Sequence, residues 1–522
     1  MVHGASPDPG DQPLPKLVVL GSGWGATALI KELEPGGYAT TVISPENYFL
    51  FTPLLPEATV GSVESRSLME NMRKICRRAR ARFVEAEAYD IHVDDKMVEV
   101  VSRSGEHFLV PYDKLVVAVG AGNASLGVPG VGEHTRYLKT IRDAKRIRSD
   151  IMNLFETAAL PTTPPDDKKR LLSFVVAGGG PTGIEFAAEL YDFLNDDLIH
   201  YFPELINDYV SVTIIQSGDH ILNTFSEAVS EYAERSMKAN KMQIVTNARV
   251  TEVTADTLTY KLKNPQPGQD PVVTIPSGLC LWSTGIAMRD ITRKLNARLH
   301  DQEHLRALQV NSRLQLLGKC KDQIYAIGDC ATIETPKLTE WVRDRFAASG
   351  KTAFNRQEFG AIVQSLIDEY PSSRTYYEKL DTLFEKYDAD QSGTLDLQEI
   401  LTMSRALGQR MTSLPATAQV ATQQGQYLAR KLNRLADASV DQHSKLETAS
   451  EKPFKYNHMG SLSYVGGNAA VADVYGFSGG GLGAYVLWKS VYFSEQVSAR
   501  TRALLAFDWI KHIIFGRDIS RY

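Results

Sequence analysis

Two glycine-rich runs offer the backbone geometry that binds the pyrophosphate of a dinucleotide. They read Gly21-Ser22-Gly23-Trp24-Gly25-Ala26 and Gly178-Gly179-Gly180-Pro181-Thr182-Gly183. Glycines let a backbone approach a phosphate closely, and the helix that follows supplies amide donors and a favourable dipole. The expected nucleotide-binding residues are Gly21, Gly23 and Ala26 in the first run and Gly178, Gly180 and Gly183 in the second. Two such runs in one chain indicate one nucleotide that stays bound and one that visits, as in a flavoprotein that accepts a hydride from a nicotinamide.

The elements that must position these runs form an α/β pattern. Each run directly follows an apolar segment, and a short helix over residues 26–33 follows the first. The predicted strands are residues 16–20, 38–43 and 114–121 of one domain and 173–177, 210–215 and 278–285 of the other. Residues 323–330 then return the chain to the first sheet. We therefore predict two nested Rossmann-like dinucleotide-binding domains.

Residues at the ends of the second strands help to decide what each site holds. An FAD site usually has an acid there for the adenine ribose, but here Ser44 stands first and Glu46 follows. Asp329, after a buried strand and a glycine, is suited to accept a hydrogen bond from a ribitol hydroxyl. The second site has Gln216, which lacks the charge that would repel the 2′-phosphate of NADPH. The alternative is that Gln216 is neutral in this choice and that nearby Asp219 restores some discrimination.

An acidic run of EF-hand type predicts a calcium site. Alternating oxygen side chains wrap one hard cation, Gly393 makes the sharp turn, and Glu399 closes the site bidentately. The expected ligands are Asp388, Asp390, Ser392, Thr394, Asp396 and Glu399. Helices are expected over residues 377–387 and 397–407; the alternative is a solvated acidic turn. Residues 347–358 repeat the helix-loop-helix rhythm, but Lys351 stands at a ligand position, which predicts a partner that binds no metal.

Size and composition exclude several classes of protein. A chain of 522 residues should form two or three domains, and a net charge of -5 argues against a nucleic-acid binder. The four cysteines, Cys76, Cys280, Cys320 and Cys330, form no closely spaced pair, which speaks against a zinc site, a disulfide framework and a redox-active disulfide. No apolar run reaches the ~18 residues that a membrane-spanning helix needs. Residues 1–15 resemble a disordered lead-in, not a secretory signal or a transit peptide.

The C-terminal third contains two further patterns. Gln419 and Gln423 are four residues apart and share one face of a predicted helix, a spacing that surface amides also show. Residues 484–515 are predicted to be helical and amphipathic, as in a helix lying in a membrane interface; the alternative is a dimer or core helix. The apolar residues expected on or near one face are Leu504, Phe507, Ile510, Ile514 and Phe515. The basic residues expected to add positive charge are Arg500, Arg502, Lys511, His512 and Arg517.

Five motifs together resemble one family. They are residues 21–25, the run SPENYFLFTPLLP at 44–56, GGGPTGIE at 178–185, AIGD at 326–329 and AQVATQQ at 418–424. The chain resembles the type II (alternative) NAD(P)H:ubiquinone oxidoreductases, and within them the fungal and plant external mitochondrial enzymes with an EF-hand insertion. In this family Ser-Pro replaces the usual acid at position 44. Gln216 departs from the acid of members specific for NADH, which favours NADPH as a substrate.

The resemblance implies a monotopic, non-pumping respiratory enzyme. It implies non-covalent FAD, NADPH or NADH as electron donor and ubiquinone as acceptor, with calcium as modulator. Gln419 and Gln423 would line the quinone side, and Glu185 would lie near the flavin and the nicotinamide. The expected place is the external face of the mitochondrial inner membrane, with a homodimer contact through the C-terminal region as a further possibility. The alternatives are a sulfide:quinone oxidoreductase, which needs reactive cysteines, and a calcium-responsive interaction protein like the apoptosis-inducing factors.

We expect seven segments. They are a disordered N-terminus (1–15), two parts of an FAD-binding domain (16–160 and 288–333), an NAD(P)H-binding domain (170–287), an EF-hand insertion (334–413), an FAD and quinone segment (414–483) and a membrane-binding region (484–522).

Overall fold

The computed structural model describes residues 14–520 except 321, 335–337, 370–379, 389, 409–412, 438–451 and 475. Residues 1–13 of the predicted disordered N-terminus lie outside the described residues. The chain divides into two compact units. Unit one is Met1–Phe49, Asn71–Gly122 and Ala287–Asn457, and unit two is Leu50–Glu70, Asn123–Ile286 and His458–Tyr522. The two units are described separately below.

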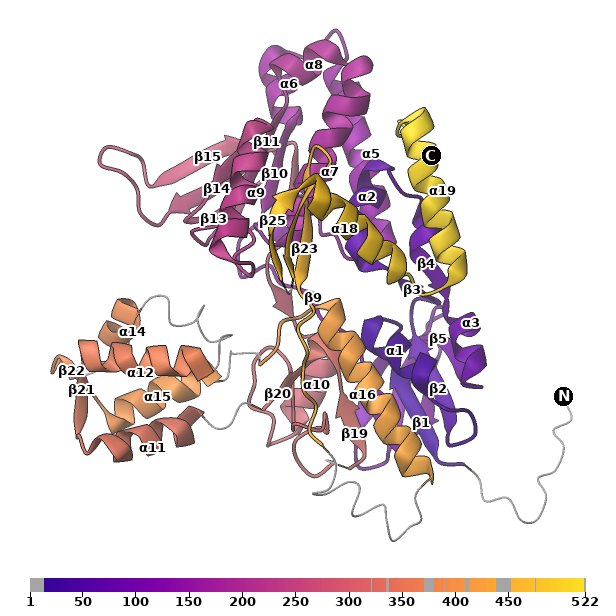
Figure 1. Ribbon diagram of the computed structural model, residues 1–522, viewed down its shortest axis with the longest axis vertical. Helices are drawn as coiled ribbons and strands as arrows, with labels where there is room; N and C mark the ends of the chain where they lie inside the picture. The colour runs from indigo at the N-terminus through magenta and orange to yellow at the C-terminus, as the bar shows by residue number, and fades with distance from the viewer. Residues whose placement is uncertain are drawn as a thin grey trace, which may run out of the picture. The chain divides into compact units, whose positions relative to one another are not determined.

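Unit one is built on a seven-stranded sheet of order β19-β8-β1-β2-β5-β6-β7 (Figure 1). Its strands are β1 (Lys16–Leu20), β2 (Ala39–Ser44), β5 (Arg82–His92), β6 (Met97–Ser102), β7 (His107–Pro111), β8 (Lys114–Val117) and β19 (Ile324–Ala326). β1 pairs in parallel with β2 and β8, and β19 pairs in parallel with β8. The late strand β19 therefore joins the first sheet, as the nested arrangement predicts.

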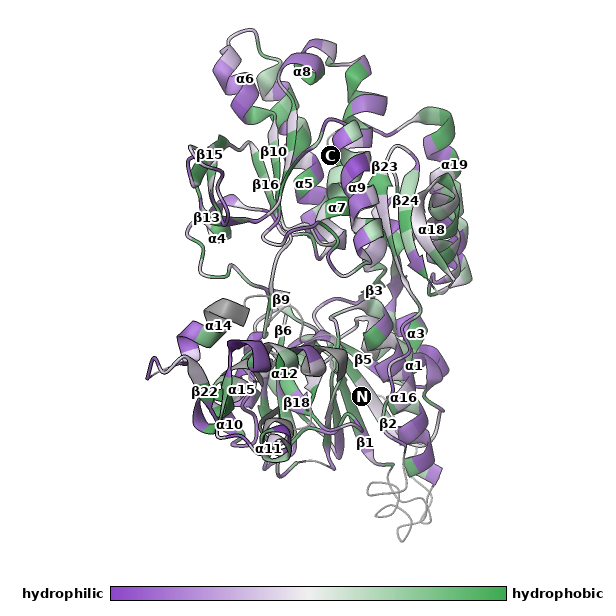
Figure 2. Ribbon diagram, turned by 60° about the vertical axis from the view of Figure 1, so that its left-hand side comes forward, coloured by the Kyte–Doolittle hydropathy of each residue, from purple (hydrophilic) through white to green (hydrophobic). Residues whose placement is uncertain are grey.

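Helices cover the sheet of unit one. They include α1 (Trp24–Glu32), α3 (Met72–Arg78), α10 (Asp290–Arg298) and α16 (Ala418–Asp437). Helix α1 begins two residues earlier than predicted, at Trp24, and every residue from Gly25 to Ile30 is buried. Helix α16 packs directly on it, because a Cβ on Gly425 would lie 2.3 Å from the Gly25 carbonyl oxygen. Figure 2 shows the strands mainly in hydrophobic green and the exposed side of α16 in purple.

Unit two has a four-stranded parallel sheet of order β12-β11-β10-β16. The strands are β10 (Ser173–Ala177), β11 (Ser211–Ile215), β12 (Gln243–Val245) and β16 (Leu279–Trp282), with helices α5 (Ile141–Ala158), α6 (Pro165–Leu171), α7 (Pro181–Asp192) and α9 (Glu227–Ala239). The long stretch between α7 and β11 contains a π-helical turn (Phe193–Asp197) and α8 (Pro203–Asp208). A separate antiparallel sheet consists of β13 (Ala248–Val253), β14 (Thr257–Leu262) and β15 (Val272–Pro276).

The C-terminal segment completes unit two. Three antiparallel strands, β23 (Ser461–Gly466), β24 (Ala469–Val474) and β25 (Phe477–Gly481), precede α18 (Leu482–Ser494) and α19 (Ala499–Phe515). Strand β23 lies against α7, and α19 returns to the short helix α2 (Leu55–Val60) through a hydrogen bond from Trp509 Nε1 to Glu57 Oε2. Within the described residues, no helix combines the length and the apolar character needed to cross a bilayer.

The inserted segment of unit one has a small core of its own. Two helix-loop-helix pairs, α11 (Leu338–Ser349) with α12 (Arg356–Glu369) and α14 (Leu380–Tyr387) with α15 (Leu397–Gly408), are joined by the antiparallel strands β21 (Ala353–Asn355) and β22 (Thr394–Asp396). Its buried residues are Phe346, Phe354, Phe359, Val363, Phe384, Leu395, Ile400, Leu401 and Met403. The two ends of the insertion meet, since the Ser413 amide donates to Thr332 Oγ1 at 3.0 Å.

Candidate functional site

The glycine loop of unit one has the geometry of a phosphate cradle. Gly21 has φ +113°, and a Cβ there would lie 2.3 Å from the Ala118 carbonyl oxygen, so only glycine fits. Gly23 caps α1 with φ -75°, and no heavy atom lies within 4 Å of the position its Cβ would take. The loop therefore turns tightly at one glycine and leaves open space at the other, where a ligand can approach the backbone.

The glycine loop of unit two repeats this geometry. Gly178 has φ +119°, and a Cβ there would lie 2.9 Å from Ser283 Oγ. Gly180 caps α7 with φ -77°, and its Cβ position is open. Gly183 has the closest packing, because a Cβ there would lie 2.2 Å from the Gly178 carbonyl oxygen. The corresponding residue of the first loop, Ala26, is fully buried.

Ser44 and Asp329 both belong to unit one. Ser44 is buried at the end of β2, and its hydroxyl lies 2.9 Å from Ser22 Oγ and accepts from the Glu46 amide at 3.3 Å. Asp329 lies in a short helical turn directly after Ile327 and is partly exposed. Ser44 thus ties the second strand to the glycine loop.

Gln424 is a residue that the sequence analysis missed. Its side chain is buried, and its Oε1 accepts from the Gly328 amide at 2.7 Å, next to Asp329. The helical spacing of the buried residues Val420, Ala421, Leu428 and Gln424 itself would have placed it on the inner face of α16. Gln424 therefore fixes the turn that presents Asp329.

The two predicted quinone-side amides also lie in unit one, one turn apart on α16. Gln419 Oε1 accepts from the Tyr456 hydroxyl at 3.2 Å. Gln423 forms two hydrogen bonds with the Asn457 backbone, one in each direction, at 2.8 and 2.9 Å. Both amides therefore bind the extended segment that follows residue 451. Gln423 uses its side-chain oxygen as acceptor and its side-chain nitrogen as donor in these bonds.

Gln216 supports the glycine loop of unit two. Its Oε1 accepts from the Gly179 amide at 3.0 Å, and its Nε2 donates to the His220 carbonyl oxygen at 3.3 Å. Lys263, which is distant in sequence, donates to the Ser217 carbonyl oxygen, so an ammonium group lies beside this strand end. No local pattern could have revealed Lys263, because it follows the end of β14 and is 46 residues away from Ser217 in the sequence.

Glu185 is a buried acid on the helix that follows the second loop. It accepts from the Tyr464 amide at 3.4 Å, and burial raises the pKa of its carboxyl to about 8. The neighbouring carboxylate Glu189 raises this pKa further, whereas the Tyr464 hydrogen bond opposes the shift. At neutral pH Glu185 therefore carries a proton.

The predicted calcium loop brings its acids together. Carboxylate oxygens of Asp388, Asp390 and Glu399 all lie within 4.8 Å of one another. Gly393 has φ +74°, and its amide donates to Asp388 Oδ2 at 3.0 Å. Ser392, Thr394 and Asp396 follow along the same loop. These oxygens form the kind of donor set that calcium prefers.

The loop of the first helix-loop-helix pair has the same closing hydrogen bonds as the loop of the second, but it lacks the acidic residues. Glu399 exchanges hydrogen bonds with the backbone and side chain of Asp396, and Glu358 does the same with Asn355. In the first loop the Lys351 ammonium pairs with Glu358. An internal cation thus contacts the carboxylate that would close a metal site.

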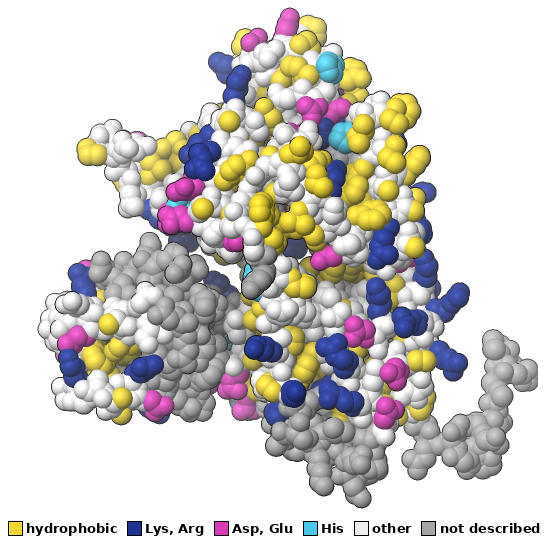
Figure 3. All heavy atoms as spheres, in the orientation of Figure 1, with side chains coloured by type: hydrophobic (Ala, Val, Ile, Leu, Met, Phe, Trp, Pro, Cys, Tyr) yellow, Lys and Arg dark blue, Asp and Glu magenta, His cyan; other side chains and the backbone are white. Residues whose placement is uncertain are grey.

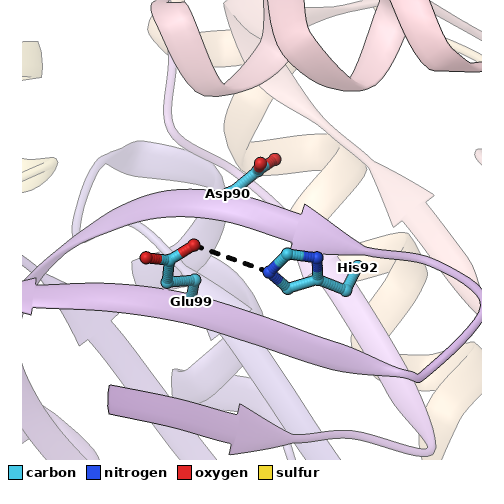
Figure 4. A group of neighbouring side chains, drawn as sticks. All are labelled: Asp90, His92 and Glu99. Atoms are coloured by element: carbon cyan, nitrogen blue, oxygen red, sulfur yellow. Dashed lines mark ion pairs between the residues drawn. The ribbon is translucent and has the colours of Figure 1, made fainter. Parts of the chain in front are cut away.

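A second group of acids with histidine lies on β5 and β6 (Figure 4). His92 Nε2 is 3.5 Å from Glu99 Oε2, the pair marked by the dashed line in Figure 4, and a carboxylate oxygen of Asp90 lies within 4.8 Å of a ligand atom of each. Asp90 Oδ1 accepts from Arg298 at 2.8 Å. His107 Nδ1 also lies 2.7 Å from Glu99 Oε1. We interpret the group as structural pairs that these residues form with one another and with Arg298.

All four cysteines are free and buried. Burial raises the pKa of Cys330 and of Cys280 to about 12, so neither forms a thiolate at neutral pH.

Two family models match the chain. One, described as pyridine nucleotide-disulphide oxidoreductase, matches residues 15–346. The other, described as NDH2 C-terminal domain, matches residues 458–518. The second match covers β23 to α19.

Similar proteins extend over nearly the whole chain. The external alternative NAD(P)H-ubiquinone oxidoreductase B1, mitochondrial, of Solanum tuberosum is 38% identical over 97% of this chain and 90% of its own length. The external alternative NADH-ubiquinone oxidoreductase, mitochondrial, of Yarrowia lipolytica is 33% identical over 98% of this chain and 82% of its own.

Solved structures show the same fold. NDH2 from Plasmodium falciparum in complex with NADH aligns with a TM-score of 0.78 at 26% identity, covering 97% of this chain and 99% of that one. The sulfide:quinone oxidoreductase of Aquifex aeolicus aligns with a TM-score of 0.61 at 16% identity, covering 97% and 96%, and shares the fold alone.

Proposed function

The chain belongs to the external alternative NAD(P)H-ubiquinone oxidoreductases, the type II NADH dehydrogenases, and from this premise we propose that it passes electrons from NAD(P)H through bound FAD to ubiquinone at the mitochondrial inner membrane. The observation that carries the proposal is the pair of glycine loops. Each has a forced left-handed glycine followed by an open one at a helix N-terminus. A protein with two such cradles is built to handle two dinucleotides.

FAD fits the loop of unit one. The open position at Gly23 leaves room for a pyrophosphate, and we assign the partly exposed Asp329 carboxylate to a ribitol hydroxyl. When bound, FAD supplies the acceptor for a hydride and the donor of two electrons. This chain contributes the turn that Gln424 fixes and the Ser22–Ser44 contact that anchors the loop. Since no covalent link is needed, acid precipitation should release the yellow colour, and colour retained in the pellet would contradict a non-covalent site.

The nicotinamide nucleotide is assigned to the loop of unit two. Gln216 uses one N–H on the His220 carbonyl and keeps a second for a ribose or phosphate oxygen. Lys263 adds positive charge near the same strand end. Both features favour acceptance of a 2′-phosphate, so we infer that NADPH is used as well as NADH.

The sulfide-oxidising alternative has no support from the cysteines. That chemistry needs reactive thiolates, and all four thiols are buried. A measurement of activity distinguishes the enzyme from the interaction-protein alternative, since an inactive flavoprotein scaffold would not oxidise NAD(P)H.

The experiment for the main proposal is anaerobic. Purified yellow protein is mixed with NADPH or NADH, and the flavin absorbance is followed; a short-chain ubiquinone is then added. We expect bleaching by the nucleotide and recovery of colour with the quinone. A flavin that the nucleotides do not bleach, or that the quinone does not reoxidise, would contradict the proposal.

We propose calcium as a ligand of the inserted segment. The carboxylates of Asp388, Asp390 and Glu399 lie within 4.8 Å of one another, whereas in the equivalent loop the Lys351 ammonium pairs with Glu358. Because Thr332 and Ser413 join the ends of the insertion next to Asp329 in sequence, ordering of the loop can act on the flavin turn. Coupling of this kind typically amounts to ~1–3 kcal/mol.

The calcium proposal is tested with Glu399→Gln. The variant should bind calcium more weakly in isothermal titration because it loses a bidentate carboxylate. Its matched control is Glu358→Gln in the companion loop, which should leave calcium affinity unchanged. Equal activity in chelator and in calcium would show that the loop is only structural.

The membrane surface is proposed to bind the apolar face of α18 and α19. Ile513, Phe515 and Phe507 on α19 are 84%, 80% and 65% exposed, and Leu482 and Val486 on α18 are 66% and 58% exposed. Figure 3 shows hydrophobic side chains gathered along these helices. The basic residues contribute less than the sequence suggested, because the Arg517 side chain is only 4% exposed. The same face is the candidate for a homodimer contact.

Point variants test this surface better than truncation, since Leu505 is fully buried and Asp508 is bonded to the Ser67 hydroxyl. Ile513→Ser with Phe515→Ser should abolish sedimentation with liposomes while flavin content stays normal. Leu109→Ser, at a 57% exposed position of β7, is the control. Unchanged sedimentation together with a loss of dimers would assign the face to self-association.

A further inference from the structure

Helix α7 carries three buried acids on one face. Glu185, Glu189 and Asp192 are spaced four and three residues apart, and each is no more than 6% exposed. Tyr464 of β23 touches both ends of the row, since its amide donates to Glu185 and its hydroxyl to Asp192. Buried acids this close together are unfavourable unless they hold protons or pair with cations. The row therefore needs an explanation beyond packing.

A cavity of unit two opens onto the middle of this row. It encloses about 480 Å³, part of it open to solvent, and Glu189 and Asp192 line it while Glu185 does not. Glu57 lines it too: Glu57 Oε2 accepts from Trp509, whereas Oε1 is buried and has no hydrogen-bond partner among the described residues. A polar cavity with an unpaired buried oxygen is a place for ordered water. Water in the cavity would thus reach Glu189.

Burial and the charges around Glu189 together leave it protonated. The titratable groups that line the cavity beside it are the acids Glu57, Asp192 and Asp196, the bases Lys489, His512 and Arg517, and the phenols Tyr464 and Tyr485. Burial lowers the pKa of His512 to about 4, so it adds no positive charge at neutral pH. Arg517 lies 3.6 Å from Glu189 Oε2 but is held more closely by Asp197, at 2.7 Å. Burial, followed by the Glu57 carboxylate, accordingly raises the pKa of Glu189 to about 8.

The chemistry of the proposed reaction requires a proton from solution. NAD(P)H delivers a hydride, which is two electrons and one proton. Reduction of a quinone to a quinol takes two electrons and two protons. One proton per turnover must therefore be taken up from water, and the buried site needs a donor for it.

We propose that Glu189 takes this proton from the cavity and relays it to Glu185, which gives its own proton toward the reduced acceptor. In each cycle Glu185 loses a proton, Glu189 reprotonates it, and water in the cavity reprotonates Glu189, so charge and protons balance. Both carboxyls start and end the cycle neutral. Glu189 is a positioning residue for the proton, not a group that touches the substrate. The inference rests on the proposed quinone reductase activity.

The test separates the two half-reactions in a stopped-flow spectrometer. The flavin-loaded Glu189→Gln variant keeps the size of the side chain and an acceptor for the Ser62 hydroxyl, which lies 3.2 Å from Glu189 Oε2, but it cannot titrate. We expect bleaching by NADPH at the wild-type rate and reoxidation by a short-chain ubiquinone slowed at least about tenfold. Glu189→Asp, which still titrates, should restore part of the rate. Glu70→Gln is the control, since Glu70 is as buried as Glu189 but bonds to Ser498 and lies outside the cavity lining.

A wild-type measurement covers the case in which Glu189→Gln fails to fold. Glu189 is a donor only while protonated, so the reoxidation rate should fall as pH rises through about 8, while the bleaching rate does not follow the same titration. A reoxidation rate that is flat across this pH, or a folded Glu189→Gln variant that reoxidises like wild type, would overturn the relay. If quinone does not reoxidise even wild-type flavin, the proposed function fails instead.

Discussion

The two glycine loops have similar backbone φ angles and similar open space at their second glycines. The helices that follow them differ in the side chains that they bury. The first glycines have φ +113° and +119°, and both second glycines leave open space. Helix α1 then buries only Gly25 to Ile30, an uncharged run, against α16. Helix α7 buries Glu185, Glu189 and Asp192 against β23.

This difference indicates a division of labour. A permanently bound nucleotide is best served by a rigid, apolar support, and close helix contact at Gly25 and Gly425 provides one. A reaction that consumes protons needs titratable groups, and these are concentrated on the helix behind the loop for the visiting nucleotide. Under the proposed assignment, the same backbone turn holds the resident nucleotide in unit one and the reacting nucleotide in unit two.

The largest expected effect comes from the forced glycines that the loops share. Gly21→Ala would place a Cβ 2.3 Å from the Ala118 carbonyl oxygen at a positive φ, and Gly178→Ala would place one 2.9 Å from Ser283 Oγ. We expect Gly21→Ala to lose at least about 3 kcal/mol of folding stability. Gly178→Ala should lose less, because the nearest backbone atoms there, Ser283 C and O, lie 3.0 Å from the Cβ position, and the slightly closer Ser283 hydroxyl can move. Chemical denaturation checks this, and equal losses would break the ranking.

The next effect concerns the buried acids, which only the second helix has. The folded pKa of Glu185 is about 8, above its ordinary value of 4.5. The stability that this protonation supports is full below about pH 4.5 and is lost as pH rises through 8. Glu185→Gln should therefore flatten the pH dependence of the free energy of unfolding, gaining on the order of 1–3 kcal/mol relative to wild type above pH 8. Parallel curves for the two proteins would show that Glu185 is ionised in the fold.

A smaller effect is expected from the support of the flavin turn. Gln424→Ala leaves the Gly328 amide without its acceptor, which typically costs about 1–3 kcal/mol. Flavin should dissociate about tenfold more readily, since 1.4 kcal/mol corresponds to a factor of ten. Gln423→Ala, whose partner is Asn457 and not the turn, is the control. Flavin retention equal to wild type in Gln424→Ala would remove this residue from the site.

The smallest effect concerns the choice of nucleotide in the second loop. Gln216→Glu can keep its bond from the Gly179 amide while adding a charge that opposes a 2′-phosphate. We expect the KM for NADPH to rise about tenfold, or ~1.4 kcal/mol, and that for NADH to stay the same or fall. Lys263→Met should also raise the KM for NADPH selectively. If the ratio of the KM values for NADPH and NADH is unchanged in both variants, other residues determine the choice of nucleotide.

The sequence predicted the parts of the fold that local patterns determine. Lys16–Leu20 and Ser173–Ala177 are strands with the predicted bounds, and Gly23 and Gly180 cap the predicted helices. Contacts set by distant segments were not predictable. One such contact is the hydrogen bond from the Gly328 amide to Gln424, and another is the bond from Lys263 to the Ser217 carbonyl oxygen. Each joins residues that are 46 or more positions apart in the sequence. Arg517 does not add exposed positive charge as predicted, because the fold buries it and bonds it to Asp197, a contact that no local pattern reveals.

The most direct test of the division of labour uses the two open glycines. Gly23→Ala and Gly180→Ala place matched methyl groups where no protein atom lies within 4 Å, at φ values that alanine accepts, so both proteins should fold. The measurement is flavin content together with the rate of flavin bleaching by NADPH. We predict that Gly23→Ala is purified with little flavin, whereas Gly180→Ala keeps its flavin and is bleached slowly. Full flavin in Gly23→Ala, or wild-type bleaching in Gly180→Ala, would contradict the assignment of the two loops.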